Sequence, residues 1–190
     1  MATGHARAAF HNGVRIDTGF EAFVAERSAG LLRTAYLLTL DLGHAEDLLQ
    51  TALLRTARHW AQARAAPDAY VRQVLVNLSR DRWRLLRRRP TEAPLTLDLH
   101  DGRHGDGPAD QVADRRVVAQ ALAALPVRQR QVIVLRFFED LPVAETARLL
   151  GFSEGTVKSY TSRALSRLRE LLAEGDALKP SIVEVRHAHR

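Results

Sequence analysis

The segment from Val143 to Leu172 constrains the fold of this chain most tightly, because it has the pattern of two helices joined by a tight turn. Ala147 provides a small side chain where the helices would cross, and Gly151 can turn sharply without a Cβ clash. Ser153 is a favourable N-cap for the second helix, and the β-branched Val157 would anchor that helix to a core. The segment therefore predicts a helix-turn-helix motif.

The first turns of the second helix carry short hydroxyl and cationic side chains. These residues are Gly155, Thr156, Lys158, Ser159, Ser162 and Arg163. Such a face packs poorly against protein, but it can approach phosphates and base edges in a major groove. The alternative, a solvated amphipathic helix in an ordinary bundle, is less favoured because three framework positions of the motif match.

Composition favours a helical protein with a polyanionic partner. The chain has 190 residues, of which 46% are hydrophobic and 6% aromatic, and this suits two small helical domains better than a β-rich core. The net charge of +6 is compatible with nucleic acid and equally with an anionic membrane surface. Charge alone therefore does not separate these two partners.

Cysteine usage and the amino terminus indicate the compartment. The chain has no cysteine, which excludes disulfides, thiolate zinc sites and a cysteine nucleophile. The amino-terminal residues lack the apolar core of a signal peptide, and no apolar run approaches the roughly 18 residues of a spanning helix. We therefore expect a soluble cytoplasmic protein that does not use a membrane.

An abrupt change of composition divides the chain into two predicted helical domains, at residues 19–89 and 113–175. Residues 90–112 between them contain three prolines and three glycines, which predicts a flexible linker. Residues 1–18 are predicted to be a mobile tail, and residues 176–190 a second tail. The fold class expected is therefore all-α.

Apolar periodicity predicts the main helices. In the first domain one helix carries the stripes from Phe20 to Leu38, a second spans His44–Gln62, and a third begins near Pro67. The buried stripe expected in the second domain consists of Val132, Ile133, Leu135 and Phe137.

The third helix, from Asp68 to Arg89, divides into an apolar and a cationic face. The apolar face consists of Val71, Val74, Leu75, Leu78 and Leu85, and the opposite face of Gln73, Asn77, Arg80, Arg84 and Arg87. Tyr70 and Trp83 lie toward the flanks, where aromatic rings could stack on unstacked bases beside an arginine track. Sealing the core is an equally good explanation for Trp83, whereas phosphate contact is favoured for the arginine cluster.

Four ordered strings carry a resemblance to a known family. They are AEDLLQTALLRTARHW at Ala45–Trp60, AYVRQVLVNLSRDRWR at Ala69–Arg84, LPVRQRQVIVLRFFEDL at Leu125–Leu141 and GTVKS at Gly155–Ser159. With these strings the chain resembles the extracytoplasmic-function (ECF) group of σ70-type RNA polymerase sigma factors, and in particular its SigE-like actinobacterial subgroup. The resemblance extends from Phe20 to Leu172.

The resemblance implies both the architecture and the function. The first domain would be the sigma region 2 bundle and the last the region 4 helix-turn-helix. The chain would direct core RNA polymerase, through its β′ and β subunits, to promoter DNA, recognising minus-10 and minus-35 elements and assisting DNA opening in transcription initiation. It would be no enzyme, would need no cofactor or metal, and would join the nucleoid when bound to polymerase. Whether an anti-sigma factor also binds is left open.

The resemblance also assigns site residues. The polymerase-binding set is Glu46, Asp47, Gln50 and Arg55; the minus-10 set is Asn77, Arg80, Trp83, Arg84 and Arg87; the minus-35 set is Ser153, Gly155, Thr156, Lys158, Ser159 and Arg163. The loop Arg64–Asp68 occupies the place where the family binds a flipped base. Asp81 could instead pair with Arg80 or Arg84 on its own helix. Thr51 and Tyr160 depart from the residues that are frequent in the family.

Two other classes of function are weaker. A free-standing helix-turn-helix regulator would usually need a dimerising element, and none follows Leu172 in the sequence. A metal-dependent enzyme could use the nitrogen and oxygen atoms of His100, Asp101, His104 and Asp106, but these residues lie in a Pro/Gly-rich stretch without a rigid scaffold. A sigma factor explains both domains.

Overall fold

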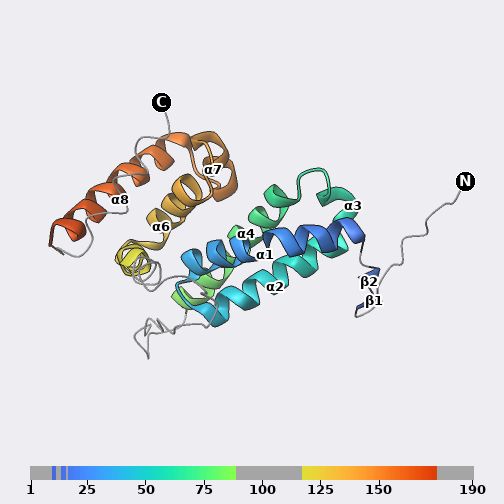
Figure 1. Ribbon diagram of the computed structural model, residues 1–190. Helices are drawn as coiled ribbons and strands as arrows, with labels where there is room; N and C mark the ends of the chain where they lie inside the picture. The colour runs from blue at the N-terminus through green and yellow to red at the C-terminus, as the bar shows by residue number, and fades with distance from the viewer. Residues whose placement is uncertain (1–9, 12–13, 16, 89–116, 175–190) are drawn as a thin grey trace, which may run out of the picture. The chain divides into compact units, whose positions relative to one another are not determined.

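The computed structural model describes residues 10–11, 14–15, 17–88 and 117–174, whose helices form two compact units (Figure 1). The first unit contains α1 (Thr18–Thr39), α2 (Leu42–Arg58), α3 (Trp60–Ala63) and α4 (Pro67–Arg88). The second contains a helix over residues 117–123, then α6 (Val127–Ile133), the π-helix η1 (Val134–Phe138), α7 (Val143–Leu150) and α8 (Glu154–Glu174). The predicted linker at residues 90–112 and the predicted tail at 176–190 lie outside the described residues.

A short antiparallel ladder precedes α1. Strand β1 (Phe10–His11) pairs with β2 (Val14–Arg15), with Phe10 opposite Arg15. An Asn-Gly pair separates the two strands in the sequence, and this pair favours two-residue hairpin turns. The ladder was not predicted from the sequence, and it is too short to alter the helical architecture.

The core of the first unit is shared by α1, α2 and α4, which run side by side in Figure 1. Its buried residues are Phe20, Phe23, Leu31, Ala35, Ala45, Leu48, Leu49, Ala52, Val71 and Leu75. The alanines in this set are fully buried, and their small side chains allow the helices to approach closely. Trp60 of α3 closes one end, with its ring edge-on to Phe20 at a centroid distance of 5.3 Å.

The second predicted helix, His44–Gln62, was wrong as a continuous element, because the chain breaks at His59. This residue has φ −113° and ψ 23°, and its N–H is shared between the carbonyls of Arg55 and Thr56 at 3.2 and 3.1 Å. The break starts the separate helix α3 at Trp60, whose ring contacts Phe20 and Phe23. The helix therefore breaks directly before Trp60, the residue whose large ring packs against α1.

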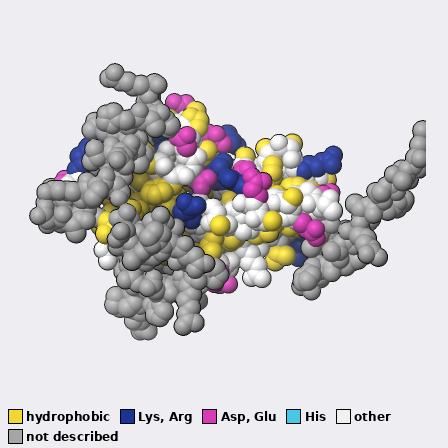
Figure 2. All heavy atoms as spheres, in the orientation of Figure 1, with side chains coloured by type: hydrophobic (Ala, Val, Ile, Leu, Met, Phe, Trp, Pro, Cys, Tyr) yellow, Lys and Arg dark blue, Asp and Glu magenta, His cyan; other side chains and the backbone are white. Residues whose placement is uncertain are grey.

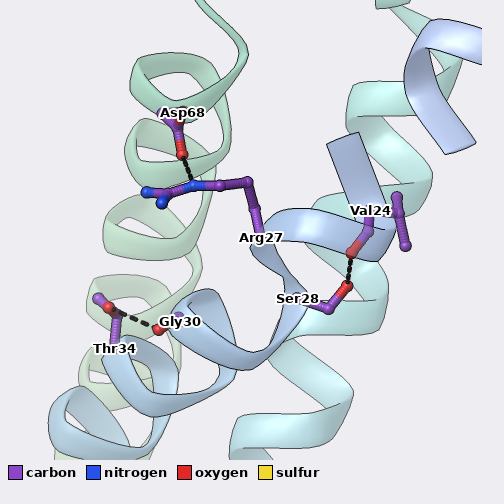
Figure 3. A network of polar contacts seen from close by, with 6 residues as sticks. All are labelled: Val24, Arg27, Ser28, Gly30, Thr34 and Asp68. Atoms are coloured by element: carbon purple, nitrogen blue, oxygen red, sulfur yellow. Dashed lines mark hydrogen bonds and ion pairs between the residues drawn. The ribbon is translucent and has the colours of Figure 1, made fainter. Parts of the chain in front are cut away.

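An ion pair joins α1 to the first turn of α4 (Figure 3). Arg27 Nε donates to Asp68 Oδ1 at 2.6 Å, and Asp68 is also well placed for the helix dipole at the N-terminus of α4. Because both side chains are more than one third exposed, the pair contributes no more than about 1 kcal/mol. The pair links α1 to the N-terminal end of α4, directly after the loop that contains Arg64.

The apolar face of α4 is used only over its first half. Val71 and Leu75 are fully buried, and Leu78 packs partly against the same core. Leu85 was expected on the buried face, but 65% of its surface is exposed. That prediction was wrong because periodicity identifies a face and not its partner, and the described core ends before Leu85.

The second unit packs α6, η1, α7 and α8 around a core that includes Val132, Leu135, Leu150 and Val157, all fully buried. Phe137 was predicted to be buried, but it is 39% exposed, as is its neighbour Phe138 at 46%. The π-helix explains this difference, because bonds such as Glu139 N–H to the Val134 carbonyl add one residue to the turn and rotate the following side chains. None of the described helices in either unit combines the length and apolar character needed to cross a bilayer.

Candidate nucleic-acid interface

The turn of the predicted helix-turn-helix is stabilised by its own backbone. Gly151 ends α7 in the left-handed region, with φ 67° and ψ 38°, where a side chain would be strained. The N–H groups of Gly151 and Phe152 both donate to the Ala147 carbonyl, which satisfies the end of α7. The sequence thus places glycine where the chain reverses between the two helices.

Ser153 caps α8 through its side chain. The Thr156 N–H donates to Ser153 Oγ at 3.1 Å, and the Thr156 hydroxyl lies 2.9 Å from the same oxygen. Two residues of the predicted minus-35 set therefore define the start of the helix that would enter DNA.

The remaining residues of that set project from the first turns of α8. Gly155, Lys158 and Arg163 are exposed, Ser159 is half-buried, and Val157 between them is fully buried. Within the described residues, neither Lys158 nor Arg163 has an acidic partner. Both cations are therefore available to an external anion.

Lys158 also lines a groove of about 330 Å³ in the second unit. The other lining residues are Arg136, Val143, Thr161, Ser162, Leu165 and Arg169. Three cations and two hydroxyls thus surround one hollow, which suits phosphate oxygens. Sequence reasoning missed two of these cations. Arg169 could have been found, because it shares a helix face with Lys158 and Ser162; Arg136 could not, because it comes from η1.

Arg136 is held in place at this groove. One of its terminal nitrogens donates to the Leu141 carbonyl, and its guanidinium lies 6.0 Å from the Phe137 ring centroid. Its Nε is buried and has no hydrogen-bond partner among the residues described. The hydrogen bond and the ring contact hold the guanidinium in one orientation at the groove, which suits binding of an anion there. Elsewhere in this unit, burial lowers the pKa of Arg130 below its ordinary value.

In the first unit, the predicted minus-10 residues lie along α4. Asn77, Arg80 and Arg84 are exposed and Trp83 is half-buried. Arg84 pairs with Asp81 one turn away on the same helix, as one of the two pairings considered for Asp81. Arg87 lies within α4, but its side chain falls outside the described part of the chain.

The flanking aromatic Tyr70 contacts a second ring. Its centroid lies 6.5 Å from that of His59, with the planes tilted by 30°. The His59 Nδ1 atom lies 2.9 Å from the Arg55 carbonyl, which favours the tautomer that donates from Nδ1. This ring pair lies at the two ends of the segment that contains the loop Arg64–Asp68.

The predicted polymerase-binding residues all lie on α2. Glu46, Asp47, Gln50 and Arg55 are exposed, while the opposite side of α2 contributes five buried residues to the unit. The structure therefore presents these four side chains to solvent on one helix.

Charge is interspersed on the face of the molecule shown in Figure 2. On the face shown in Figure 2, basic side chains alternate with acidic and apolar ones. The net charge of +6 therefore does not form one continuous cationic surface on that face, and anion binding depends on local sites such as the groove. The described residues contain no group of His, Asp and Glu that could hold a metal ion, and His100, Asp101, His104 and Asp106 lie outside them.

Comparison with protein families decides the class of the molecule. Sigma-70 region 2 matches residues 23–89, and Sigma-70 region 4 matches residues 115–168. This chain belongs to the σ70 family of RNA polymerase sigma factors. Its function is therefore that of a sigma factor in transcription initiation, as the sequence motifs predicted.

Individual relatives define the group within the family. The chain is 45% identical over 160 residues to the RNA polymerase sigma-E factor of Streptomyces avermitilis, covering 83% of this chain and 87% of that protein. It is 37% identical over 155 residues to the ECF sigma factor SigM of Mycobacterium tuberculosis, covering 80% and 76%. Membership of the ECF group and the SigE-like resemblance are confirmed.

A solved structure supports the fold. The chain is similar to the sigma factor RpoE of Bartonella quintana, solved in complex with the anti-sigma factor NepR, with a TM-score of 0.58 and 26% identity. The similarity covers 80% of this chain and 98% of the RpoE chain. The predicted all-α fold with region 2 and region 4 helical domains is confirmed.

Proposed function

We propose that this sigma factor recognises a minus-35 element with α8 and opens a minus-10 element with α4, while α2 binds core RNA polymerase. The observation that supports this most directly is the helix-turn-helix, in which Lys158 and Arg163 project without an acidic partner among the described residues. The chain itself would perform no covalent chemistry, and it would act in the cytoplasm at the nucleoid.

At the minus-35 element, phosphate and base contacts divide between residues. Lys158, Arg136 and Arg169 surround one groove and would bind backbone phosphates, which position the protein without reading sequence. Ser159 and Arg163 lie farther from the groove on the exposed side of α8 and would contact base edges. Gly155 lies in the first turn and presents no side chain, which allows the DNA to approach the helix closely.

At the minus-10 element, α4 would hold a strand whose bases are unstacked. Unstacking costs a few kcal/mol per base, and stacking and backbone charge must offset it. Arg80 and Arg84 supply exposed cations, and the Tyr70 ring beside His59 supplies an aromatic surface. Arg84 would exchange its intrahelical partner Asp81 for a phosphate.

Selective initiation tests the proposal. Core polymerase mixed with this chain and a promoter library should start at a restricted set of sites that share two elements. Lys158→Ala or Arg163→Ala should weaken promoter binding by about 1–3 kcal/mol. Arg167→Ala is the matched control, because Arg167 lies on the same helix and is already paired with Glu170 at 3.1 Å. Sequence-specific binding without polymerase would instead indicate a free-standing regulator.

An anti-sigma partner is a further part of the proposal. It is supported by the similar structure of RpoE, which was solved with the anti-sigma factor NepR. Inhibition of selective initiation by a protein that binds either unit would test it.

A further inference from the structure

The groove beside α8 gathers cations that no described acid balances. Lys158, Ser162, Leu165 and Arg169 are spaced four, three and four residues apart, so they share one face of α8. Arg136 reaches the same groove from η1. Within the described part of the chain, no acidic side chain lines the groove or pairs with any of these three cations. Because like charges repel, a bound anion would stabilise this arrangement.

One cation of the groove is held in place, and the other two can adapt to a ligand. A terminal nitrogen of Arg136 donates to the Leu141 carbonyl, and the guanidinium lies 6.0 Å from the Phe137 ring centroid. Lys158 and Arg169 are exposed on long side chains whose end groups can move. The groove therefore combines a fixed planar donor with two adjustable ones, and each can bind a phosphate oxygen through a charge-assisted hydrogen bond.

The dimensions of the groove favour an elongated ligand with several phosphate groups. The stripe from Lys158 to Arg169 rises about 16 Å along α8, at 1.5 Å per residue. A single phosphate monoester carries a charge of only about −1.5 to −2 at pH 7, which does not balance three cations. The exposed Ser162 hydroxyl lies between the two ends of the stripe and can donate to a phosphate group there. A volume of about 330 Å³ lies within the range of small-molecule sites.

We propose that this groove binds a free linear oligophosphate, of the length of a triphosphate chain, when DNA is absent. Inorganic tripolyphosphate and the triphosphate chain of a nucleotide share this chemistry. In a nucleotide, the nucleoside would lie against Val143 and Leu165, which form the apolar part of the lining. The inference goes beyond promoter recognition, because the ligand binds the chain alone. Since the oligophosphate and the DNA backbone would use the same cations, each would exclude the other from the groove.

Titration calorimetry of the full chain, without DNA, polymerase or divalent cations, tests the length of the ligand. Affinity should rise about tenfold from orthophosphate to pyrophosphate and again to tripolyphosphate, because each added phosphate group engages a further cation. Citrate, a compact multivalent carboxylate, is the control for charge alone and should bind at least about tenfold more weakly than tripolyphosphate. Equal affinity for orthophosphate and tripolyphosphate, or for citrate and tripolyphosphate, would overturn the proposal.

Substitutions test the location of the site. Lys158→Gln and Arg169→Gln should each weaken tripolyphosphate binding about tenfold. Arg167→Gln is the matched control, because it removes the same charge from α8, while Arg167 does not line the groove and is paired with Glu170. Circular dichroism should show the same helix content in all three variants. If Arg167→Gln weakens binding as much as Arg169→Gln does, binding follows net charge and the groove is not the site.

Nucleoside triphosphates, titrated in the same way, distinguish the two sources of the phosphate chain. Tighter binding than that of tripolyphosphate would identify a nucleotide that also uses the apolar part of the lining, and equal binding would show that the inorganic chain is sufficient. Binding of neither would overturn the proposal.

The outcomes also separate this inference from the proposed function. If no oligophosphate binds but the chain directs selective initiation, the inference fails and the function stands. If tripolyphosphate binds in the groove but initiation is not selective, the function fails and the inference stands.

Discussion

The rings of Phe152 and Tyr160 meet edge to face, with centroids 5.7 Å and planes 84° apart. Phe152 lies in the turn before α8, and Tyr160 lies in the second turn of α8. The guanidinium of Arg128 in α6 lies 5.9 Å from the Phe152 ring centroid, so side chains from two helices, α6 and α8, meet at this ring. The contact braces the recognition helix against α6, which gives Tyr160 a structural role.

Removing the Phe152 ring should therefore destabilise the second unit and weaken promoter binding together. Because the ring is only half-buried, Phe152→Ala should lower the free energy of unfolding by about 1–3 kcal/mol. Tyr160→Phe keeps the ring pair and should have little effect, whereas Tyr160→Ala should resemble Phe152→Ala. Urea unfolding followed by circular dichroism measures each change. Equal damage from Tyr160→Phe would assign the effect to the hydroxyl and contradict the brace.

The turn and cap of the helix-turn-helix were predictable because their causes are local. Gly151 adopts the left-handed conformation that ends α7, and the Ser153 hydroxyl accepts from the N–H of Thr156 at the start of α8. Each residue acts on backbone groups no more than five positions away. The inward and outward sides of α2 were predictable for the same kind of reason, since helical periodicity determines which side chains share a face.

Features that depend on distant partners were not predictable. The exposure of Phe137 follows from a π-helix, and the exposure of Leu85 follows from where the core ends. Arg136 joins Lys158 at one groove only after η1 and α8 have packed together. A single sequence shows which residues could face a partner, but it does not show the partner.

A buried hydroxyl in α7 offers a test of stability. Thr146 is fully buried, and its Oγ1 has no hydrogen-bond partner among the described residues. Thr146→Val removes the unpaired polar group with little change of volume, so it should raise the free energy of unfolding by about 1 kcal/mol or more. Thr56→Val is the matched control: Thr56 is equally buried, but it donates to the Ala52 carbonyl at 2.8 Å, and its substitution should not stabilise.

The two substitutions need different probes, because both tryptophans, Trp60 and Trp83, lie in the first unit. Tryptophan fluorescence reports the unit that contains Thr56, and circular dichroism includes the unit that contains Thr146. A loss of stability in Thr146→Val would show that its hydroxyl is bonded in solution.

Gly155 separates stability from recognition. A Cβ at this position would meet only the Ser153 hydroxyl, at the ordinary contact distance of 3.9 Å, so Gly155→Ala should leave the fold unstrained. Alanine also favours the helix, and the free energy of unfolding should rise by up to about 1 kcal/mol. Promoter affinity should fall, because the added methyl group separates the helix from the groove edge. Unchanged affinity in a footprinting assay with polymerase would remove Gly155 from the DNA contact surface.

The cationic groove predicts a particular dependence on salt. Each cation that neutralises a backbone phosphate releases condensed counterions, so each should contribute about one unit to the slope of log affinity against log salt concentration. Lys158→Ala and Arg169→Ala, measured with polymerase on promoter DNA, should each reduce that slope by about one and weaken binding to all promoters equally. Arg163→Ala should change the preference among promoters more than the slope, because base contacts specify and phosphate contacts position. Arg167→Ala, with its cation paired to Glu170, should leave both unchanged. If Arg169→Ala leaves the slope at the value of the unaltered chain, the groove does not hold a phosphate and Lys158 acts without it.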